Sequence, residues 1–352
     1  MSRYYDIVIV GAGPAGLSAA FFIKQLDPSK DVLIVERLSE ERWCHYHSIC
    51  GEGISLRAFK DLKPITPWAK KENVGRAVIH WPEDVTTTQS LNGVILDRPR
   101  FLDELRSSFQ ERGGDVLKGS VRSVSGNEKG FLTLLSDGNE IRSRYIIGAD
   151  GAFSTVRRDL FGSRPKCIVP VDRYILDVEP DHGVMHFYIN SEYKGGYKWE
   201  FPSGDATNAG LPAGTGRINN FIEKGSRFLP FGGVGPVVKG NAILIGDAAA
   251  QANPVCFGGL RISMTAGKKA AEAIVKGVPN RYQEWWSKSS FSSPLFMKAH
   301  SVLASWTDKE MYNAAVPFQR RARVRPFISR FFSSPHDAHI YIAYVLTFLE
   351  GW

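Results

Sequence analysis

The chain has 352 residues, of which 43% are hydrophobic, with 34 glycines and 19 prolines. This composition excludes a disordered chain and is typical of a loop-rich α/β enzyme with one or two intimately joined domains. The net charge of +8, from 44 basic and 36 acidic residues, suits an anionic ligand or a membrane surface as well as nucleic acid. We expect no nucleic-acid partner.

Cysteine usage and hydropathy indicate the compartment. Four scattered cysteines, Cys44, Cys50, Cys167 and Cys256, are too few for a disulfide scaffold, so a reducing compartment is expected. A predicted strand close to the first residue leaves no room for a signal peptide, and no run of about twenty apolar residues occurs. We expect a cytoplasmic protein without a membrane span, with peripheral contact to the inner face of the membrane left open.

The first element is a strand at residues 6–10 that runs through a glycine turn into a helix ending before Asp27. Gly11 permits the tight turn, Gly13 lets the backbone approach a pyrophosphate, and Gly16 allows helix and strand to pack closely. Unpaired N–H groups at the helix N-terminus favour the phosphate charge. A second strand, 31–35, ends in Glu36, which accepts hydrogen bonds from ribose hydroxyls or is an ordinary charged strand end. The combination predicts a dinucleotide site.

The segment 43–54 is rich in cysteine, histidine and glycine. Its candidate zinc ligands would be Cys44, His45, His47 and Cys50, but their spacing matches no common structural zinc pattern, and we expect no metal. The alternative is a loop that faces a flavin, in which Gly51 and Gly53 admit a flat ring close to the backbone.

The next elements are an irregular stretch at 64–88 and then a strand at 94–96 that leads into an amphipathic helix after Arg98. Phe101, Leu102 and Leu105 share the apolar face of this helix. Arg98 serves a pyrophosphate or pairs with an acid. Further strands are predicted at 116–121 and 131–134, with a hairpin turn at 137–139.

Two later strands end in polar motifs. The strand before Asp150 ends in Gly148-Ala149-Asp150-Gly151 and is followed by a predicted helix. The strand at 242–245 ends in Gly246-Asp247-Ala248, where Asp247 can accept a ribityl hydroxyl, and a helix is expected at 262–276. The Gly258 and Gly259 backbone and this helix N-terminus can hold the pyrimidine edge of a flavin.

The GxGxxG turn at Gly11, the GADG turn at Gly148 and the GDA turn at Gly246, in this order, resemble the motifs of the glutathione-reductase-type FAD proteins, in the branch of para-hydroxybenzoate hydroxylase. The resemblance implies FAD as cofactor and an α/β fold with a Rossmann-like FAD-binding domain, an inserted antiparallel-sheet substrate domain and a C-terminal helical region. The predicted boundaries are 1–60, 97–160 and 236–280 for the FAD-binding domain, 61–96 and 161–235 for the substrate-binding domain, and 281–352 for the helical region. The predicted cofactor-binding residues are Gly11, Gly13, Ala15, Gly16, Glu36, Arg37, Cys50, Gly51, Gly53, Arg98, Val121, Asp150, Asp247, Gly258, Gly259 and Leu260.

Within that branch the chain is similar to the geranylgeranyl reductase family. Cys50-Gly51-Glu52-Gly53-Ile54 resembles the family's cysteine-bearing loop, and residues 197–202 resemble its YxWxFP motif. In the family a GxG pattern normally follows this motif. Gly210 matches its first glycine, whereas Pro212 replaces the second. Arg261, which follows the Gly258-Gly259 pair, has no role that the sequence explains. The alternating aromatic residues suit a core or an apolar ligand tunnel equally. The predicted substrate-binding residues are Tyr197, Trp199, Phe201, Pro202 and Gly210.

The C-terminal part shows helical spacing from about Arg281. It also carries a basic cluster at 320–330 (Arg320, Arg321, Arg323, Arg325 and Arg330) and an apolar run at 340–346. One interpretation is a packed helix with a solvated basic face. The other is a surface that meets anionic lipid headgroups.

The resemblance implies an FAD-dependent reductase that saturates carbon–carbon double bonds of geranylgeranyl chains on an anionic prenyl lipid, in membrane lipid biosynthesis. Cys50 is the candidate catalytic residue near the flavin, or a small apolar filler, because a free thiol is a weak acid. No second dinucleotide motif is present, so the electron donor is left open between NAD(P)H, ferredoxin and reduced flavin. The alternative function is a flavin-dependent monooxygenase or halogenase that uses oxygen on an apolar substrate.

Overall fold

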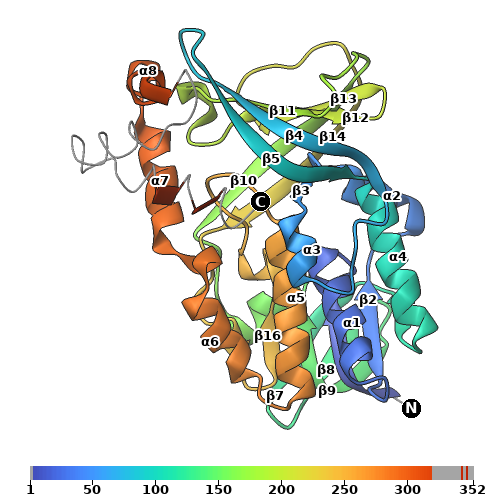
Figure 1. The fold of residues 1–352 in the computed structure, drawn as a ribbon. Coiled ribbons are helices and arrows are strands. Elements are labelled where there is room, and N and C mark those ends of the chain that lie inside the picture. The colour runs from blue at the N-terminus through green and yellow to red at the C-terminus, as the bar shows by residue number, and fades with distance from the viewer. Residues whose placement is uncertain (1–2, 319–341, 344–345, 348–352) are drawn as a thin grey trace.

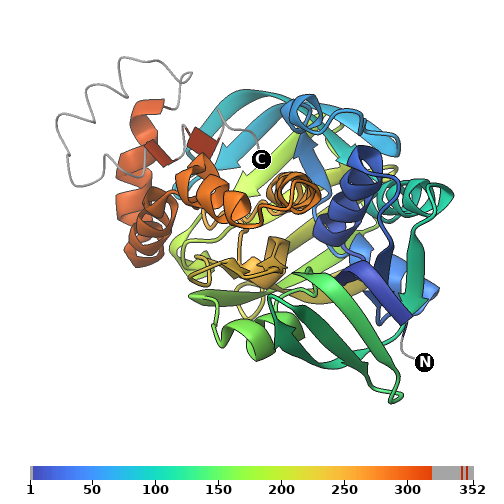
Figure 2. The same ribbon diagram turned by 90° about the horizontal axis from the view of Figure 1, so that it is seen from below.

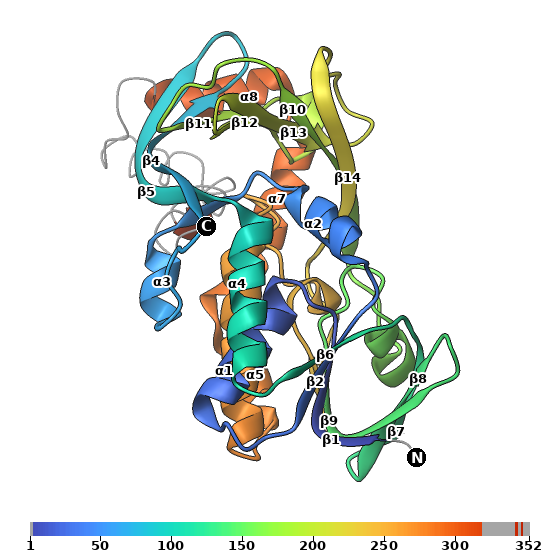
Figure 3. The ribbon, with the colours of Figure 1, turned by 90° about the vertical axis from the view of Figure 1, so that its right-hand side faces the viewer.

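The computed structural model describes residues 3–318, 342–343 and 346–347. Figure 1 shows two β-sheets, one in the lower half of the molecule and one across the top, with long helices beneath the upper sheet. Both the views of Figure 1 and Figure 3 place helices α1, α4 and α5 next to the lower sheet. The predicted α/β class, with a second unit built on its own sheet, is confirmed by this architecture.

The lower sheet is a parallel sheet with an antiparallel extension. Its central pairs are parallel, with Val8 opposite both Leu33 and Ile146, and its middle strand is buried on both faces, as the continuous apolar run 7–10 requires. The antiparallel strands β7 (Val121–Asn127) and β8 (Gly130–Leu135) extend it from β9. The main order of strands is β15 (Val238–Lys239), β16 (Ala242–Leu244), β9 (Glu140–Gly148), β1 (Arg3–Val10), β2 (Val32–Glu36) and β6 (Asp115–Lys118).

Three helices pack beside this sheet: α1 (Pro14–Leu26), α4 (Arg98–Glu111) and α5 (Leu260–Val275). The helices α1 and α5 approach so closely that a Cβ atom at Gly267 would lie 2.6 Å from the Ala15 carbonyl oxygen. The Ser18 hydroxyl donates to the Met264 carbonyl across the same contact. This contact holds α1, which begins after Gly13, close to α5, which begins after Gly259.

The upper sheet is mostly antiparallel and includes one parallel pair, β4 with β11, so the expectation of an antiparallel sheet is wrong for that pair. Its face toward the helices is apolar over the middle strands, with Val74, Met185, Trp199 and Phe201 in one buried cluster. The order of strands is β14 (Phe221–Phe231), β10 (Cys167–Leu176), β13 (Ala206–Pro212), β12 (Lys198–Ser203), β11 (Val184–Tyr188), β4 (Lys70–His80), β5 (Thr86–Leu96) and β3 (Gly53–Ser55).

The interpretation of 64–88 as irregular is wrong, because all of β4 and the start of β5 lie there. Three prolines and a glycine, Pro64, Pro67, Pro82 and Gly75, interrupt the alternating pattern that would predict a strand in this stretch. It also has few contiguous β-branched residues before Thr86. The two strands form through long antiparallel pairing with each other and through pairing of β4 with β11, more than a hundred residues later. Such tertiary pairing overrides local propensity.

Three other boundaries differ from the predicted ones. Residues 43–48, expected within a loop, belong to α2 (Glu40–Ser48), whose first turn carries Glu40 and Glu41 at the favourable end of the helix dipole. The strand predicted at 116–121 divides at Gly119, whose N–H donates to the Glu36 carbonyl. The helix expected after Asp150 is a short helical turn, η1 (Arg157–Phe161).

Figure 2 shows the later helices along one side of the molecule, away from the antiparallel extension of the lower sheet. The remaining helices are α3 (Arg57–Asp61), α6 (Asn280–Lys288), α7 (Pro294–Ser305) and α8 (Asp308–Ala315). The remaining short helical turns are η2 (Ser191–Tyr193), η3 (Gly246–Ala249), η4 (Ser290–Ser292) and η5 (Val316–Phe318).

The basic cluster at 320–330 lies outside the described residues, as does most of the apolar run at 340–346. Of that run, Ala343 and Leu346 belong to an apolar cluster with Phe296 and Leu303 of α7. Over the part of the chain that the structure describes, no helix is long and apolar enough to cross a bilayer.

Candidate active site

The glycine turn between β1 and α1 is packed directly against the Ala149-Asp150 turn. Gly11 has φ +103°, and a Cβ atom there would lie 2.4 Å from the Ala149 carbonyl oxygen. A Cβ atom at Gly16 would lie 2.0 Å from the Gly11 carbonyl oxygen. Gly13 is the N-cap of α1 and makes no side-chain cap. The first-turn N–H groups of α1 therefore have no side-chain acceptor, and Gly13 and Ala15 line a cavity.

Glu36 bridges this turn to the end of β2. One carboxylate oxygen accepts from the Ala12 N–H and the other accepts from the Leu38 N–H, both at 2.8 Å. The Trp43 indole N–H donates to the Ala12 carbonyl from the other side. Each carboxylate oxygen keeps a second acceptor position, and Glu36 and the adjacent Arg37 line the cavity.

Two partly buried carboxylates follow the other strand ends. Asp150 accepts from the N–H groups of Thr155 and Val156 through one oxygen, and its other oxygen is buried without a hydrogen-bond partner among the described residues. Asp247 accepts from the Arg227 guanidinium at 3.2 Å. Burial raises the pKa of both carboxyls, and Arg227 partly opposes this for Asp247. Both side chains line the same cavity.

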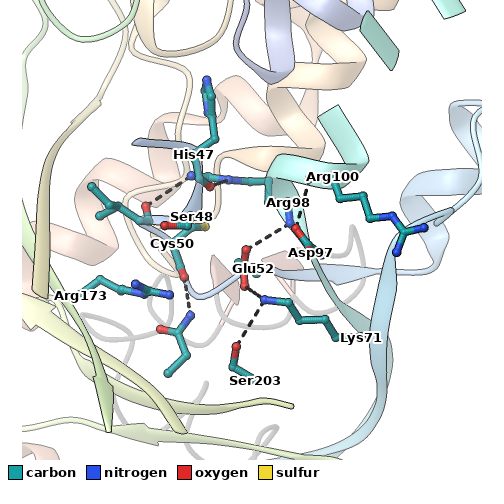
Figure 4. Close-up of polar contacts among 12 residues, drawn as sticks. His47, Ser48, Cys50, Glu52, Lys71, Asp97, Arg98, Arg100, Arg173 and Ser203 are labelled. Atoms are coloured by element: carbon teal, nitrogen blue, oxygen red, sulfur yellow. Dashed lines mark hydrogen bonds and ion pairs between the residues drawn. The ribbon is translucent and has the colours of Figure 1, made fainter. Parts of the chain in front are cut away.

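The loop that follows α2 is fixed by Glu52 and Arg98. Glu52 has φ +61° and is only 1% exposed; it accepts from the Arg98 N–H at 3.1 Å and from the Lys71 ammonium at 2.7 Å. Figure 4 shows Glu52 between the start of α4 and Lys71 of β4. The Arg98 guanidinium donates to the carbonyls of His47 and Ile49. These contacts hold the Cys50–Gly53 loop at the cavity.

Through these two carbonyls the Arg98 guanidinium caps the C-terminal end of α2. It also lines the cavity, with Cys50, Gly51, Gly53 and Val121. His47, buried beside Arg98 and Arg227, has a pKa well below its ordinary value because of burial and these two cations. The site keeps this imidazole neutral.

The aromatic residues of the YxWxFP stretch line the cavity and also pack into the core of the upper sheet. Tyr197, Trp199 and Phe201 lie at the cavity with Phe187 of β11. Gly210 does not line it; a Cβ atom there would lie 2.1 Å from the Trp199 ring, so its role is to admit the indole. Pro202 does not line the cavity either and is buried in β12. Gly16, in the glycine turn, is also absent from the lining and packs against the Gly11 carbonyl.

The glycine pair before α5 forms the opposite wall. Gly258, Gly259 and Leu260 line the cavity, and Gly259 is the N-cap of α5 without a side-chain cap. The Tyr197 hydroxyl donates to the Cys256 carbonyl at 2.5 Å, which joins this wall to the aromatic residues. Burial raises the pKa of the Cys256 thiol to about 11.

The structure explains Arg261 and places Pro212. Arg261 is buried at the start of α5, and its guanidinium forms a 2.8 Å ion pair with Asp61 of α3. Pro212 ends β13, where a Cβ atom at Gly196 would lie 2.8 Å from its ring. The Pro212 ring therefore packs against Gly196, at the position where the family pattern has its second glycine.

The candidate zinc ligands do not come together. Cys44, His45 and His47 lie on α2, and all four cysteines are free. Among the described residues no group of three or more His, Cys, Asp or Glu side chains could hold a metal ion.

Sequence reasoning missed four polar residues at the site: Glu52, Arg173, Asn208 and Arg227. Glu52 belongs to the cysteine-bearing loop motif, but the sequence indicates no function for its side chain. Arg173 of β10 and Arg227 of β14 line the cavity with 5% and 16% of their side chains exposed. These two arginines have no local sequence signal, because only the pairing of β10 with β14 brings both to one face of the sheet.

The glycine turn, the carboxylates of Glu36, Asp150 and Asp247, the Cys50–Gly53 loop, the aromatic residues and the glycine pair before α5 border one cavity of about 690 Å³. Its polar end is bordered by the glycine turn, Glu36 and Asp150, and its other end by the aromatic residues together with Ala77, Ile79 and Met185. This arrangement suits a dinucleotide with an apolar ligand beside it.

Comparisons with known proteins agree with this geometry. A model of the lycopene cyclase protein family matches residues 6–175. A digeranylgeranylglycerophospholipid reductase 2 from Methanothermobacter thermautotrophicus is 30% identical, over 87% of this chain and 90% of its own. One from Methanopyrus kandleri is 29% identical, over 91% and 92%.

Solved structures show the same fold. A geranylgeranyl bacteriochlorophyll reductase-like protein from Thermoplasma acidophilum matches with a TM-score of 0.77, at 20% identity over 96% of this chain and 98% of its own. A probable FAD-dependent monooxygenase from Pseudomonas aeruginosa matches with a TM-score of 0.69, at 14% identity over 89% and 100%. The likeness in sequence to the reductases extends over nearly the whole chain, and it is this likeness that assigns the family. This chain belongs to the geranylgeranyl reductase family, which includes the digeranylgeranylglycerophospholipid reductases.

Proposed function

We propose that this chain binds FAD and saturates carbon–carbon double bonds in the geranylgeranyl chains of an anionic prenyl lipid, in membrane lipid biosynthesis. The observation that carries the proposal is the single cavity that joins a dinucleotide-binding turn to an aromatic and aliphatic wall. Relatives named for this reaction supply the reaction class.

The residues present fit FAD on structural grounds. The uncapped N-terminus of α1 and the glycine turn, where a side chain at Gly11 would collide with the Ala149 carbonyl, suit a pyrophosphate. The spare acceptor positions of Glu36 suit ribose hydroxyls. Asp150 lines the same cavity, and its unpartnered carboxylate oxygen would accept a hydrogen bond from a donor on the cofactor. The uncapped N-terminus of α5 at Gly259 suits the pyrimidine edge of the ring system.

Isolated trisubstituted alkenes pose a specific chemical problem, because hydride addition alone would leave an unstabilised carbanion. A hydride from the reduced flavin and a proton must therefore both be added across the double bond. The residues of this chain orient the alkene along the wall of Tyr197, Trp199 and Phe201 and exclude water from it. The saturated product then carries two added hydrogen atoms, one from the hydride and one from the proton.

Cys50 is the proposed catalytic residue, at the cavity edge of the Cys50–Gly53 loop. We expect Cys50→Ala to retain its fold and its flavin and to lower the kcat for alkene reduction roughly 10- to 100-fold, because a positioned proton donor is lost. Cys50→Ser, which keeps a donor, should be intermediate. Turnover assays with both variants check this, and a kcat for Cys50→Ala equal to that of the parent chain would exclude a catalytic role.

The remaining assignments belong to the same proposal. The lower sheet and its helices form the FAD-binding domain and the upper sheet the substrate-binding domain, with the boundaries predicted from the sequence except at β3, which lies within 1–60 but belongs to the upper sheet. The electrons come from NAD(P)H, ferredoxin or reduced flavin, and the lipid is taken up at the inner membrane face through peripheral contact.

The reaction class is tested by following the bound flavin under two atmospheres. Anaerobically, dithionite-reduced protein should be reoxidised when a digeranylgeranyl phospholipid is added and should stay reduced when its fully saturated counterpart is added. Substrate-dependent oxygen uptake in air, with no anaerobic reoxidation, would instead assign the chain to the flavin-dependent monooxygenases or halogenases.

A further inference from the structure

A buried amide joins the two motif segments that face each other across the cavity. Asn208 of β13 has no exposed surface. Its side-chain oxygen accepts from the Trp199 indole N–H at 3.2 Å, and its side-chain nitrogen donates to the Cys50 carbonyl at 2.7 Å; the second bond is drawn as the dashed line below Cys50 in Figure 4. No sequence motif includes Asn208.

The packing around this amide leaves little freedom. A Cβ atom at Gly51 would lie 2.7 Å from the Phe201 ring and 3.4 Å from the Trp199 indole nitrogen, so the loop backbone lies directly on the two rings. A Cβ atom at Gly210 would collide with the other side of the Trp199 indole. The indole is therefore held between two glycines, and Asn208 sets which way its N–H points.

The other end of the loop is fixed separately. Glu52 contacts Arg98 and Lys71, whereas the Ile49 carbonyl accepts from the Arg98 guanidinium. These contacts reach the loop from α4 and β4. The hydrogen bond from Asn208 reaches it from β13, on the side where the aromatic wall lies.

We propose that Asn208 is a positioning residue that holds the Cys50 carbonyl and the Trp199 indole in register, and so fixes the wall against which the reacting alkene lies. The inference rests on the proposed function for its reaction. Its geometry is a property of the polypeptide alone, because the amide does not itself line the cavity and acts through Cys50 and Trp199, which do.

The chemistry of the amide suggests a sharp test. In Asn208→Asp the ionised side chain can accept from Trp199 but cannot donate to Cys50, and its negative charge faces a carbonyl oxygen. When protonated, the same side chain presents one acceptor and one O–H donor, as the amide does. Asn208→Asp should therefore recover function as the pH falls, whereas Asn208→Leu, which has neither group, should not.

Other ionisable groups lie in this part of the molecule and are the same in the parent chain and in every variant. On the same face of the sheet these are Arg173 of β10 with Glu223 and Arg227 of β14, and on the loop they are Cys50 and Glu52. Each variant is therefore compared with the parent chain at each pH, so that only the ratio of the two is interpreted.

The experiment measures kcat and KM for anaerobic reduction of a digeranylgeranyl phospholipid between about pH 5 and 8. Near pH 8, Asn208→Asp should show a kcat reduced roughly 10- to 100-fold, with KM within about twofold of the parent value. The ratio of its kcat to that of the parent should rise toward one as the pH falls. A flat ratio, or a loss confined to KM, would overturn the proposal.

The matched control is Thr207→Val on the same strand. Thr207 is buried, donates to the Val178 carbonyl and does not line the cavity. The Thr207→Val variant removes one partly buried hydrogen bond without affecting the loop, so its kcat should equal that of the parent. If the parent chain itself binds no flavin and reduces no lipid, the proposed function fails. In that case the positioning role is still tested, by the indole fluorescence of Asn208→Asp, which should shift with pH relative to the parent and would stay unchanged if the link had no effect on Trp199.

Discussion

Gly13→Ala is expected to fold like the parent chain and to bind FAD at least tenfold more weakly, which corresponds to about 1.4 kcal/mol. Gly13 has φ −86°, which any residue adopts, and a Cβ atom there would lie 3.4 Å from a single side-chain atom of His47. The fold therefore tolerates the methyl group. The methyl group would, however, stand in the cavity at the uncapped start of α1, where the phosphates must approach the backbone.

Titration of the apo-protein with FAD, followed by flavin fluorescence, measures the affinity, and thermal unfolding of the apo-protein measures the fold. Gly16→Ala is the contrasting variant, because its Cβ atom would lie 2.0 Å from the Gly11 carbonyl and should lower the melting temperature itself. An unchanged FAD affinity in Gly13→Ala would contradict the assignment of this turn as the phosphate site.

Lys71→Met is expected to lower the free energy of unfolding by about 3–5 kcal/mol, because it leaves the Glu52 carboxylate buried without its cation. Glu52 is 1% exposed and Lys71 28%, so the carboxylate is the member of the pair that cannot reach water. The Arg98 N–H would remain as a donor to Glu52 but carries no full charge.

Urea unfolding of three variants separates this charge effect from lost packing. The double variant Glu52→Gln/Lys71→Met removes both charges and keeps the shape of both side chains, so it should be more stable than Lys71→Met alone. A double variant that is as unstable as the single one would show that the pair contributes through packing and not through charge.

The features predicted correctly are those set by local chemistry. The strand, glycine turn and helix at Gly11 to Gly16 follow from backbone sterics, since a Cβ atom at Gly11 or Gly16 would collide with neighbouring backbone. The apolar face of α4, with Phe101, Leu102 and Leu105 fully buried, follows from helical periodicity. Such features depend on neighbours in the sequence, which the sequence displays.

The features that were missed depend on distant partners. Asn208 contacts Cys50 across 158 positions, and Lys71 is near Glu52 only because β4 pairs with β5. Arg98 lies where it was expected, at the start of a helix, but its guanidinium contacts carbonyls of α2, an element that the sequence analysis placed in a loop. Where the fold brings together polar residues from separate elements, no local pattern marks them.

The most direct test of the account is mass spectrometry of the lipid after anaerobic incubation of dithionite-reduced protein with a digeranylgeranyl phospholipid. Products heavier by steps of two hydrogen atoms are expected, formed in proportion to the flavin that is reoxidised. Recovery of the substrate at its original mass, from protein that holds its FAD in the reduced state, would contradict the proposed reduction and leave only the flavin assignment standing.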